Sequence, residues 1–285
     1  MFFVSLRLRI YEHLKSRKDP YPHRAWSLYM SAKKRIQPHI MCGVGDVADY
    51  VLLPGDPKRV ERIASFFDEA RKVADYRGFI TYTGKVDGIG ITACSTGIGC
   101  PSTAIVVEEL SKLGAKTLIR VGTTGALQPY IDVGDIIVAT GAVRSDGTSR
   151  EYMPIEYPAV ADFDIVSALL IASKDSPIKV HRGIIQSSDA FYAGSTDTLS
   201  KLAEGNVLSI EMESSTLFTL AGIKRIKAGT ILAVDGNLAK NIKKGEFDEN
   251  EKTGELDERV QRAIDEEIKI AIKAVKLLAS NQSFS

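Results

Sequence analysis

The chain has 285 residues, which suits one large domain or two small ones, and a formal net charge of only +1. Hydrophobic residues make up 44% and charged residues 26%, as in an ordinary globular protein. This charge excludes a global field that would attract nucleic acid or an anionic membrane, and no apolar run reaches the roughly 18–20 residues of a transmembrane helix. The three cysteines and four histidines lack metal spacing. They argue against a disulfide framework or structural zinc and favour a reducing, cytoplasmic setting.

The first 38 residues differ from the rest in charge. They contain nine lysines and arginines but only two acids, Glu12 and Asp19. An arginine-rich, acid-poor start is typical of an organelle targeting peptide. The alternative is a disordered or mis-assigned leader, with Met30 as the true start. We therefore expect a basic leader at 1–38 and a folded domain at 39–285.

The folded part begins with a strand–helix–strand pattern. A short strand, Val51–Leu53, ends in Pro54-Gly-Asp-Pro57, where a helix is predicted to begin. A buried strand at Ile89–Cys94 leads into a helix from Pro101 to Leu113, and the next strand is Thr117–Val121. This alternation is typical of an α/β fold.

The rest of the chain continues the alternation. Further strands are predicted at Asp135–Thr140, Gly183–Gln186, Val207–Ile210 and Gly229–Val234, and further helices at Asp162–Lys174, Glu213–Ala221 and Leu256–Ala279. In the last helix, apolar residues keep to one stripe from Leu256 to Leu278 and charges fill the other positions, which predicts packing against the sheet. The pattern predicts one α/β domain with a central mixed sheet.

A lone charge, Arg120, interrupts the buried strand Thr117–Val121, just before a predicted turn at Gly122-Thr-Thr-Gly125. Burying an unpaired guanidinium costs several kcal/mol, so Arg120 must meet an anion. The planar guanidinium, the threonine hydroxyls and free backbone amides together suit phosphate. A structural arginine paired with a buried carboxylate is the alternative.

Three other features stand where predicted strands end, the usual place for sites in α/β sheets. Gly55-Asp-Pro-Lys-Arg59 offers the amides of a helix N-terminus to an anion, or is a plain turn with a surface arginine. The glycine-rich loop Ser95–Gly99 lacks the lysine of a P-loop and is weak evidence alone. Glu211 and Glu213 flank Met212 and could bond sugar hydroxyls, or cap a helix N-terminus.

Six motifs together resemble the uridine phosphorylase branch of the nucleoside phosphorylases, in the same order and over about residue 37 to the C-terminus. They are Pro54–Pro57, Cys94–Gly99, Arg120–Ala126, Val133–Asp135, Ser187–Tyr192 and Glu211–Glu213. The resemblance implies an αβα sandwich and a homo-oligomer, usually a hexamer built as a trimer of dimers, in which two subunits share each site. It implies phosphorolysis of a nucleoside to free base and ribose 1-phosphate in nucleoside salvage. Phosphate is then a co-substrate, and no cofactor, metal, nucleic acid or membrane partner is expected.

The resemblance also implies roles for individual residues. Phosphate binding is expected at Gly55, Arg59, Arg120, Gly122, Thr123 and Thr124, with Arg77 donated to a neighbouring subunit. Ribose binding is expected at Glu211, Met212 and Glu213, and at His39, which would reach a partner's sugar. Base binding is expected at Phe191, Tyr192 and Asp235, and the catalytic residues are expected to be Arg120 and Asp235. Arg120 would fix the phosphate beside C1′ of the nucleoside.

The chain departs from the family pattern where the base is recognised. Uridine phosphorylases read uracil with Gln and Arg at the places of Ser195 and Asp197. Val234-Asp-Gly236 and Gly245–Asp248 instead resemble apicomplexan purine nucleoside phosphorylases, in which the aspartate faces N7 of the purine. Asp235 is then the expected general acid, or alternatively a turn or helix-cap residue.

We therefore expect 6-oxopurine nucleosides such as inosine and guanosine as substrates, with uridine as the alternative. Two other classes fit less well. A hydrolytic nucleosidase would leave three phosphate-type arginines without a purpose. A non-catalytic relative would be expected to have lost site residues that this chain keeps.

Overall fold

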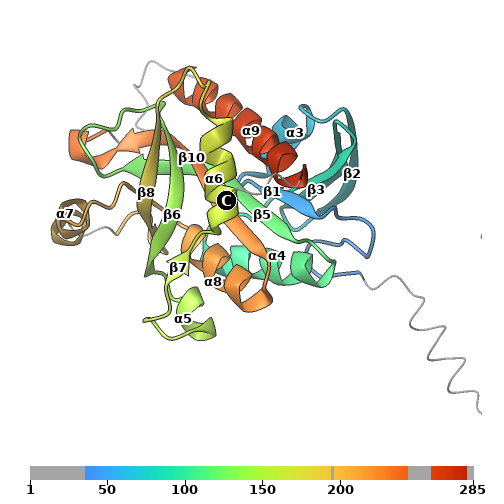
Figure 1. Ribbon diagram of the computed structural model, residues 1–285. Coiled ribbons are helices and arrows are strands. Elements are labelled where there is room, and N and C mark those ends of the chain that lie inside the picture. Colours follow the sequence, from blue (N-terminus) through green and yellow to red (C-terminus); the bar gives the residue numbers. More distant parts are fainter. Residues whose placement is uncertain (1–35, 194–195, 243–257, 281–285) are drawn as a thin grey trace, which may run out of the picture. The chain divides into compact units, whose positions relative to one another are not determined.

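The computed structural model describes residues 36–193, 196–242 and 258–280 (Figure 1). The expected basic leader lies outside the described residues except for its last three positions. Ser195, Leu256 and the segment Gly245–Asp248 lie outside them as well. Within the described part of the chain, no helix is both long and apolar enough to cross a bilayer.

The described strands form one mixed sheet, as the sequence predicts, and the sheet has ten strands. Its strands are β1 (Tyr50–Leu53), β2 (Glu69–Tyr76), β3 (Phe79–Val86), β4 (Ile89–Cys94), β5 (Thr117–Ala126), β6 (Ile136–Ser145), β7 (Ala159–Val160), β8 (Val180–Ser188), β9 (Ser209–Glu211) and β10 (Lys227–Asn237). Their order is β10-β6-β8-β9-β5-β1-β4-β3-β2, with β7 beside β6. Because β10 also pairs with β5, the strands from β5 through β9, β8 and β6 to β10 close into a ring.

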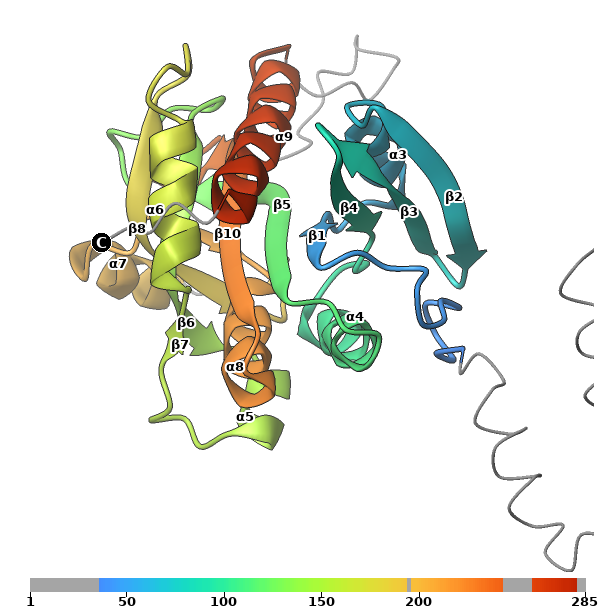
Figure 2. The same ribbon diagram turned by 45° about the vertical axis from the view of Figure 1, so that its right-hand side comes forward.

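Helices cover both faces of the sheet, which confirms the αβα sandwich (Figures 1 and 2). They are α3 (Pro57–Ala64), α4 (Cys100–Lys112), α5 (Thr148–Tyr152), α6 (Phe163–Ala172), α7 (Thr196–Glu204), α8 (Ser214–Lys224), η1 (Leu238–Lys240) and α9 (Glu258–Ala279). One core lies under α3, α6 and α9, and a second core lies under α4 and α8. The stripe of α9, which includes Val260, Ile264 and Ala271, is buried against the sheet as predicted.

The prediction of a turn at Gly122–Gly125 is wrong, because these residues are part of β5. The strand continues to Ala126, and Gly122 and Thr124 pair with Leu232 and Val234 of the parallel strand β10. The hydrogen bonds between β5 and β10 outweigh the local preference of glycine for a turn. A Cβ at Gly122 would lie 2.9 Å from Cζ of Arg120, so the glycine leaves room for that guanidinium.

Candidate active site

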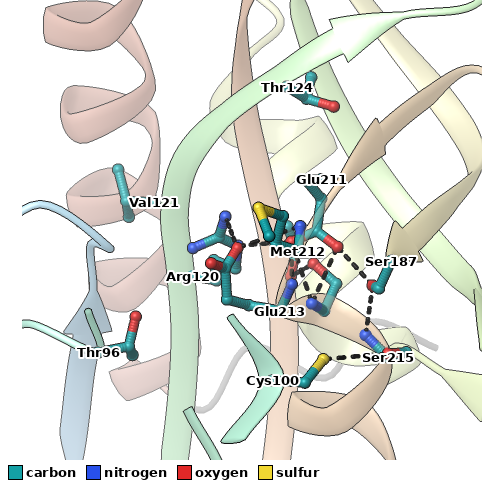
Figure 3. A network of polar contacts seen from close by, with 12 residues as sticks. Thr96, Cys100, Arg120, Val121, Thr124, Ser187, Glu211, Met212, Glu213 and Ser215 are labelled. Atoms are coloured by element: carbon teal, nitrogen blue, oxygen red, sulfur yellow. Dashed lines mark hydrogen bonds and ion pairs between the residues drawn. The ribbon is translucent and has the colours of Figure 1, made fainter. Parts of the chain in front are cut away.

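Arg120 of β5 meets two carboxylates of its own chain (Figure 3). Its Nε donates to Oε2 of Glu211 at 2.9 Å, and its Nη2 contacts Oε2 of Glu213. All three residues are buried, with 4–5% of their surface exposed. The alternative interpretation of Arg120 required a contact with a buried carboxylate, and that contact is confirmed.

One nitrogen of Arg120 remains for another partner. Nη1 is buried and has no hydrogen-bond partner among the described residues. A Cβ built on Gly55 would lie 3.8 Å from Nη1, so this nitrogen faces the glycine turn that precedes α3. A buried donor without an acceptor costs about 1–3 kcal/mol. An anion in this place would relieve that cost.

Two of the residues expected to bind phosphate, Gly55 and Arg59, lie near Arg120. Arg59, in the first turn of α3, is half-buried and donates from Nη1 to the carbonyl of Val121 at 3.4 Å, a long hydrogen bond. A Cβ on Gly55 would lie 3.3 Å from the carbonyl oxygen of Gly97, which places the loop Ser95–Gly99 beside the same turn. Three segments far apart in the sequence thus converge here: Gly55–Arg59, the loop Ser95–Gly99 and the part of β5 that carries Arg120.

The hydroxyl of Thr124 already has a partner, since its Oγ1 donates to the carbonyl of Ile210 at 2.8 Å. Its expected contact with phosphate stays a prediction. Thr123, on the opposite face of β5, is half-buried and also makes an interaction within the chain. The expected phosphate contact of Thr123 stays a prediction as well.

Glu211 is held almost entirely by the protein. Its oxygens accept the amide of Glu213 at 2.9 Å, the amide of Ser214 at 3.0 Å and the hydroxyl of Ser187 at 2.5 Å, in addition to Arg120. Because these amides open α8, the interpretation of Glu211 as a helix cap agrees with the geometry. This leaves Glu211 little capacity to accept further hydrogen bonds.

Glu213 accepts fewer hydrogen bonds from the described residues than Glu211 does. Its Oε1 accepts the amide of Gly99 at 2.7 Å and so ties the glycine-rich loop to the cluster. Burial raises the pKa of Glu213, Arg120 lowers it, and the like charge of Glu211 raises it again. Burial alone would lower the pKa of Arg120, but Glu213 and Glu211 outweigh it and raise the pKa. One guanidinium thus serves two carboxyls, and Glu213 takes up a proton more readily than an ordinary glutamate.

Asp235 lies inside β10, at a register shift between Val234 and Gly236, rather than after the strand. It is buried, with 8% of its surface exposed. The shift turns the backbone where β10 runs alongside Gly125 of β5.

A fully buried acid, Glu267 of α9, faces the site and was missed by the sequence analysis. Its carboxyl oxygens have no side-chain hydrogen-bond partner among the described residues, and the backbone of Ala233 in β10 is the polar group against it. Burial raises its pKa well above the ordinary value, Arg59 and Arg120 lower it, and Asp235 raises it. The available signal was its position: Glu267 stands three residues after Ile264 and four before Ala271, inside the apolar stripe of α9.

Replacing Glu267 with glutamine is expected to stabilise the protein increasingly as pH rises. Because the folded-state pKa is raised, the folded chain keeps a proton that the unfolded chain loses above about pH 4.5. The free energy of unfolding of the wild type should therefore fall by up to about 1.4 kcal/mol per pH unit in that window, and that of E267Q should not. Urea unfolding at pH 5, 6.5 and 8 measures the difference. The neighbouring, half-buried Glu266→Gln is the control. A constant difference between E267Q and the wild type across this range would contradict the prediction.

Four expected site residues are not brought into this cluster. Phe191 and Tyr192 are 57% and 97% exposed and contact each other edge to face, with ring centroids 4.9 Å apart. Arg77 is exposed at the turn between β2 and β3. His39 bonds through Nδ1 to Glu109 of α4 at 2.6 Å. Their roles stay predictions.

The described residues contain no group of three or more His, Cys, Asp and Glu side chains that could hold a metal ion. Two arginines and helix amides can hold an anion, and carboxyls next to them can bond hydroxyls.

Known proteins resemble this chain along most of its length. The model of the phosphorylase superfamily matches residues 49–275. A guanosine phosphorylase of Halorubrum lacusprofundi is 45% identical over 85% of this chain and 99% of its own length. A uridine phosphorylase of Thermococcus kodakarensis is 45% identical over 86% of this chain and 87% of its own. Among solved structures, uridine phosphorylase of Vibrio fischeri superposes with a TM-score of 0.77 at 33% identity, covering 89% of this chain and all of that one.

A match over most of the chain and identities near 45% show the family, and the fold agrees with it. The resemblance found in the sequence motifs is confirmed. The chain belongs to the phosphorylase superfamily and is a nucleoside phosphorylase, a pentosyltransferase.

Proposed function

We propose that phosphate binds between Arg59, the Gly55 turn and the free Nη1 of Arg120. The observation that carries this proposal is the buried guanidinium nitrogen without an acceptor. Arg120 then joins the two substrates, because the same side chain that bonds phosphate is held by the carboxylates expected to bind the sugar. An oxygen of phosphate attacks C1′ while the bond from C1′ to the base breaks and its electron pair leaves with the base. Fixed positive charge beside C1′ stabilises this transition state.

In this proposal Glu213 is the main sugar ligand. Glu211 is occupied by Ser187, by amides of α8 and by Arg120, so its role is to hold Arg120 and Glu213 in place. Glu213 can exchange its contact with Arg120 for a ribose hydroxyl, and Met212, which is half-buried, can pack on the apolar face of the ribose.

Uridine is the substrate that we propose. Relatives named uridine phosphorylase include those of Thermococcus kodakarensis and Treponema pallidum, at 45% and 41% identity. These names favour the alternative of the sequence analysis over the 6-oxopurine nucleosides expected there. Ser195, at one of the two positions used for the purine argument, lies outside the described residues.

A 6-oxopurine nucleoside is the second candidate. Two observations favour it: the relative named guanosine phosphorylase at 45% identity, and the buried carboxyl of Asp235 within β10. Initial rates with uridine, inosine and guanosine, each with saturating phosphate, test the choice. A kcat/KM for uridine at least tenfold above both purine nucleosides is expected. The reverse order would establish the second candidate.

The active unit is proposed to be at least a dimer, because Arg77 and His39 stand apart from their own chain's cluster. R77A and E213A proteins should each be nearly inactive. After subunit exchange, an equal mixture should recover about one quarter of wild-type activity, since one site in each mixed dimer has both residues intact. Arg71→Ala, on the exposed strand β2, is the control. Mixed with E213A in place of R77A, it should give no more activity than the Arg71→Ala subunits contribute by themselves. A fully active monomer in sedimentation analysis would contradict the shared site.

A further inference from the structure

Glu267 of α9 is a buried acid that the proposed reaction does not use. The side chain is fully buried, and its oxygens have no side-chain hydrogen-bond partner among the described residues. The polar group against it is the backbone of Ala233 in β10. An ionised carboxylate is strongly disfavoured in a place where no charged or polar side chain bonds it. Glu267 therefore favours its neutral form.

The helix that carries Glu267 is packed against the elements of the phosphate site. α9 lies on β5 and β10 (Figure 2), and β5 carries Arg120. Arg62 of α3 donates from Nε to Asp265 of α9 at 2.7 Å, and Arg59 stands one turn before Arg62 on the same helix. Both arginines of the phosphate site thus come from elements that contact α9.

Charged groups act on Glu267 from three of these elements. Burial raises its pKa well above the ordinary value, Arg59 on α3 and Arg120 on β5 lower the pKa, and Asp235 on β10 raises it. The effect on Arg120 is mutual, because Glu267 is one of the acids that raise the pKa of Arg120. Glu267 is therefore linked by charge to the two guanidinium groups that are proposed to hold phosphate.

The other charged groups on the packed helices are paired or nearer the surface. The buried residues of α6 are all apolar, and its Asp164 contacts Lys227. On α9 itself, Asp265 is held by Arg62, and Glu266 is half-buried. None of these groups replaces the two arginines as a partner of Glu267.

The balance of charge at the site depends on whether Glu267 is ionised. Two guanidinium groups face Glu211, Glu213, Asp235 and Glu267. With all four acids ionised, the negative charges already outnumber the positive ones, and a phosphate ion adds more. Like charges repel strongly in a buried, weakly screened place. A neutral Glu267 removes one of the charges that oppose phosphate.

We propose that Glu267 and phosphate compete for the same two arginines, and that Glu267 takes up one proton from solvent when phosphate binds. Without phosphate, Arg59 and Arg120 stabilise the carboxylate form. An anion between the arginines offsets this stabilisation, so the carboxylate becomes a carboxylic acid while phosphate is held. The proposal rests on the proposed function. It adds a residue that touches no substrate and limits the pH range in which phosphate binds tightly.

The direction of the pH effect follows from this competition. Where Glu267 is protonated with and without phosphate, it does not oppose binding. At higher pH, phosphate binds either beside a carboxylate or together with a proton, and its affinity falls. KM for phosphate should therefore rise with pH more steeply in the wild type than in a variant without this carboxyl.

The test measures KM for phosphate at pH 6, 7, 8 and 9 with a saturating nucleoside, in the wild type and in E267Q. The ionisation of phosphate and of Glu213 is common to both proteins and cancels in the ratio of their KM values. The ratio of wild type to E267Q should rise at least about threefold from pH 6 to pH 9. A merely structural role of Glu267 would shift KM by the same factor at every pH.

A second measurement counts the protons directly. Phosphate is titrated into each protein by calorimetry at the same four pH values, in two buffers that differ in ionisation enthalpy. The wild type should take up more protons per phosphate bound than E267Q in at least one pH interval, by at most one proton. Glu266→Gln on the same helix is the matched control and should behave as the wild type.

Glu267→Met provides a second variant if E267Q does not fold, because methionine has a similar length and suits the apolar stripe of α9. It should give the same change in pH dependence. A ratio of KM values that stays constant from pH 6 to pH 9, or equal proton uptake by the wild type and the variant at all four pH values, would overturn this inference alone. Phosphate that neither binds to the wild type nor speeds base release would instead overturn the proposed function.

Discussion

Replacing Arg120 with alanine is expected to lower kcat/KM for phosphorolysis at least a hundredfold, about 3 kcal/mol of transition-state stabilisation. The variant loses the donor that faces the Gly55 turn and the link between phosphate and the sugar-binding carboxyls. It also leaves Glu211 and Glu213 as neighbouring buried acids, and breaking such a pair costs about 3–5 kcal/mol of stability. Folding therefore has to be measured beside activity.

Arg120→Lys separates the two effects. Lysine keeps the positive charge near both acids but lacks the planar fork, so stability should recover while KM for phosphate stays raised. Arg144→Lys is the matched control. Arg144 is also buried, but its guanidinium bonds Ser149 and the carbonyls of Pro154 and Tyr157 instead of carboxylates. That variant should lose stability without a specific rise in KM for phosphate. Near-normal phosphorolysis by folded R120A would contradict the assignment of Arg120 as a phosphate-binding residue.

Asp235→Asn is expected to separate purine from pyrimidine chemistry. A carboxyl can pass a proton to N7 of a departing purine, and uracil has no N7 to receive it. Inosine phosphorolysis should therefore fall about 10²–10⁴-fold, and uridine phosphorolysis should stay within about threefold of the wild type. Paired assays of both nucleosides on one preparation provide the measurement.

Two outcomes of this experiment speak against the role. Equal losses on both nucleosides would make Asp235 a structural residue of the register shift in β10. A wild type whose weak inosine activity does not respond to D235N would assign the purine leaving group to another donor.

The sequence predicted the sheet, its helices and the family, because apolar periodicity and turn residues agree along most of the chain. It did not predict the hairpin of β2 and β3. Most residues of β2 are exposed, so this strand has no apolar alternation and is stabilised by pairing with β3. The turn expected at Gly122–Gly125 failed for a related reason, since pairing with β10 is a contact between distant segments that local glycine content does not reveal.

The sequence singled out Arg120, Glu211 and Glu213, which the fold brings together, but it did not predict the contacts between them, and their roles stay predictions. An anion for Arg120 was required on energetic grounds alone, and the structure provides two carboxylates while one nitrogen remains open. The phosphate and carboxylate interpretations, alternatives in the sequence, thus concern different nitrogens of one side chain. Glu109 and Glu267 were not singled out, because a single acid within a charged helix is normally solvent-exposed. Only three-dimensional packing shows that both are buried.

The central claim is that phosphate is the nucleophile and occupies the cluster around Arg120. The most direct measurement follows the sugar product from uridine and inosine by phosphorus and proton NMR, with phosphate and in a phosphate-free buffer. The account predicts ribose 1-phosphate in equimolar amount with free base, and base release that falls at least a hundredfold without phosphate. Free ribose formed at an undiminished rate in the phosphate-free buffer would contradict it and identify water as the nucleophile.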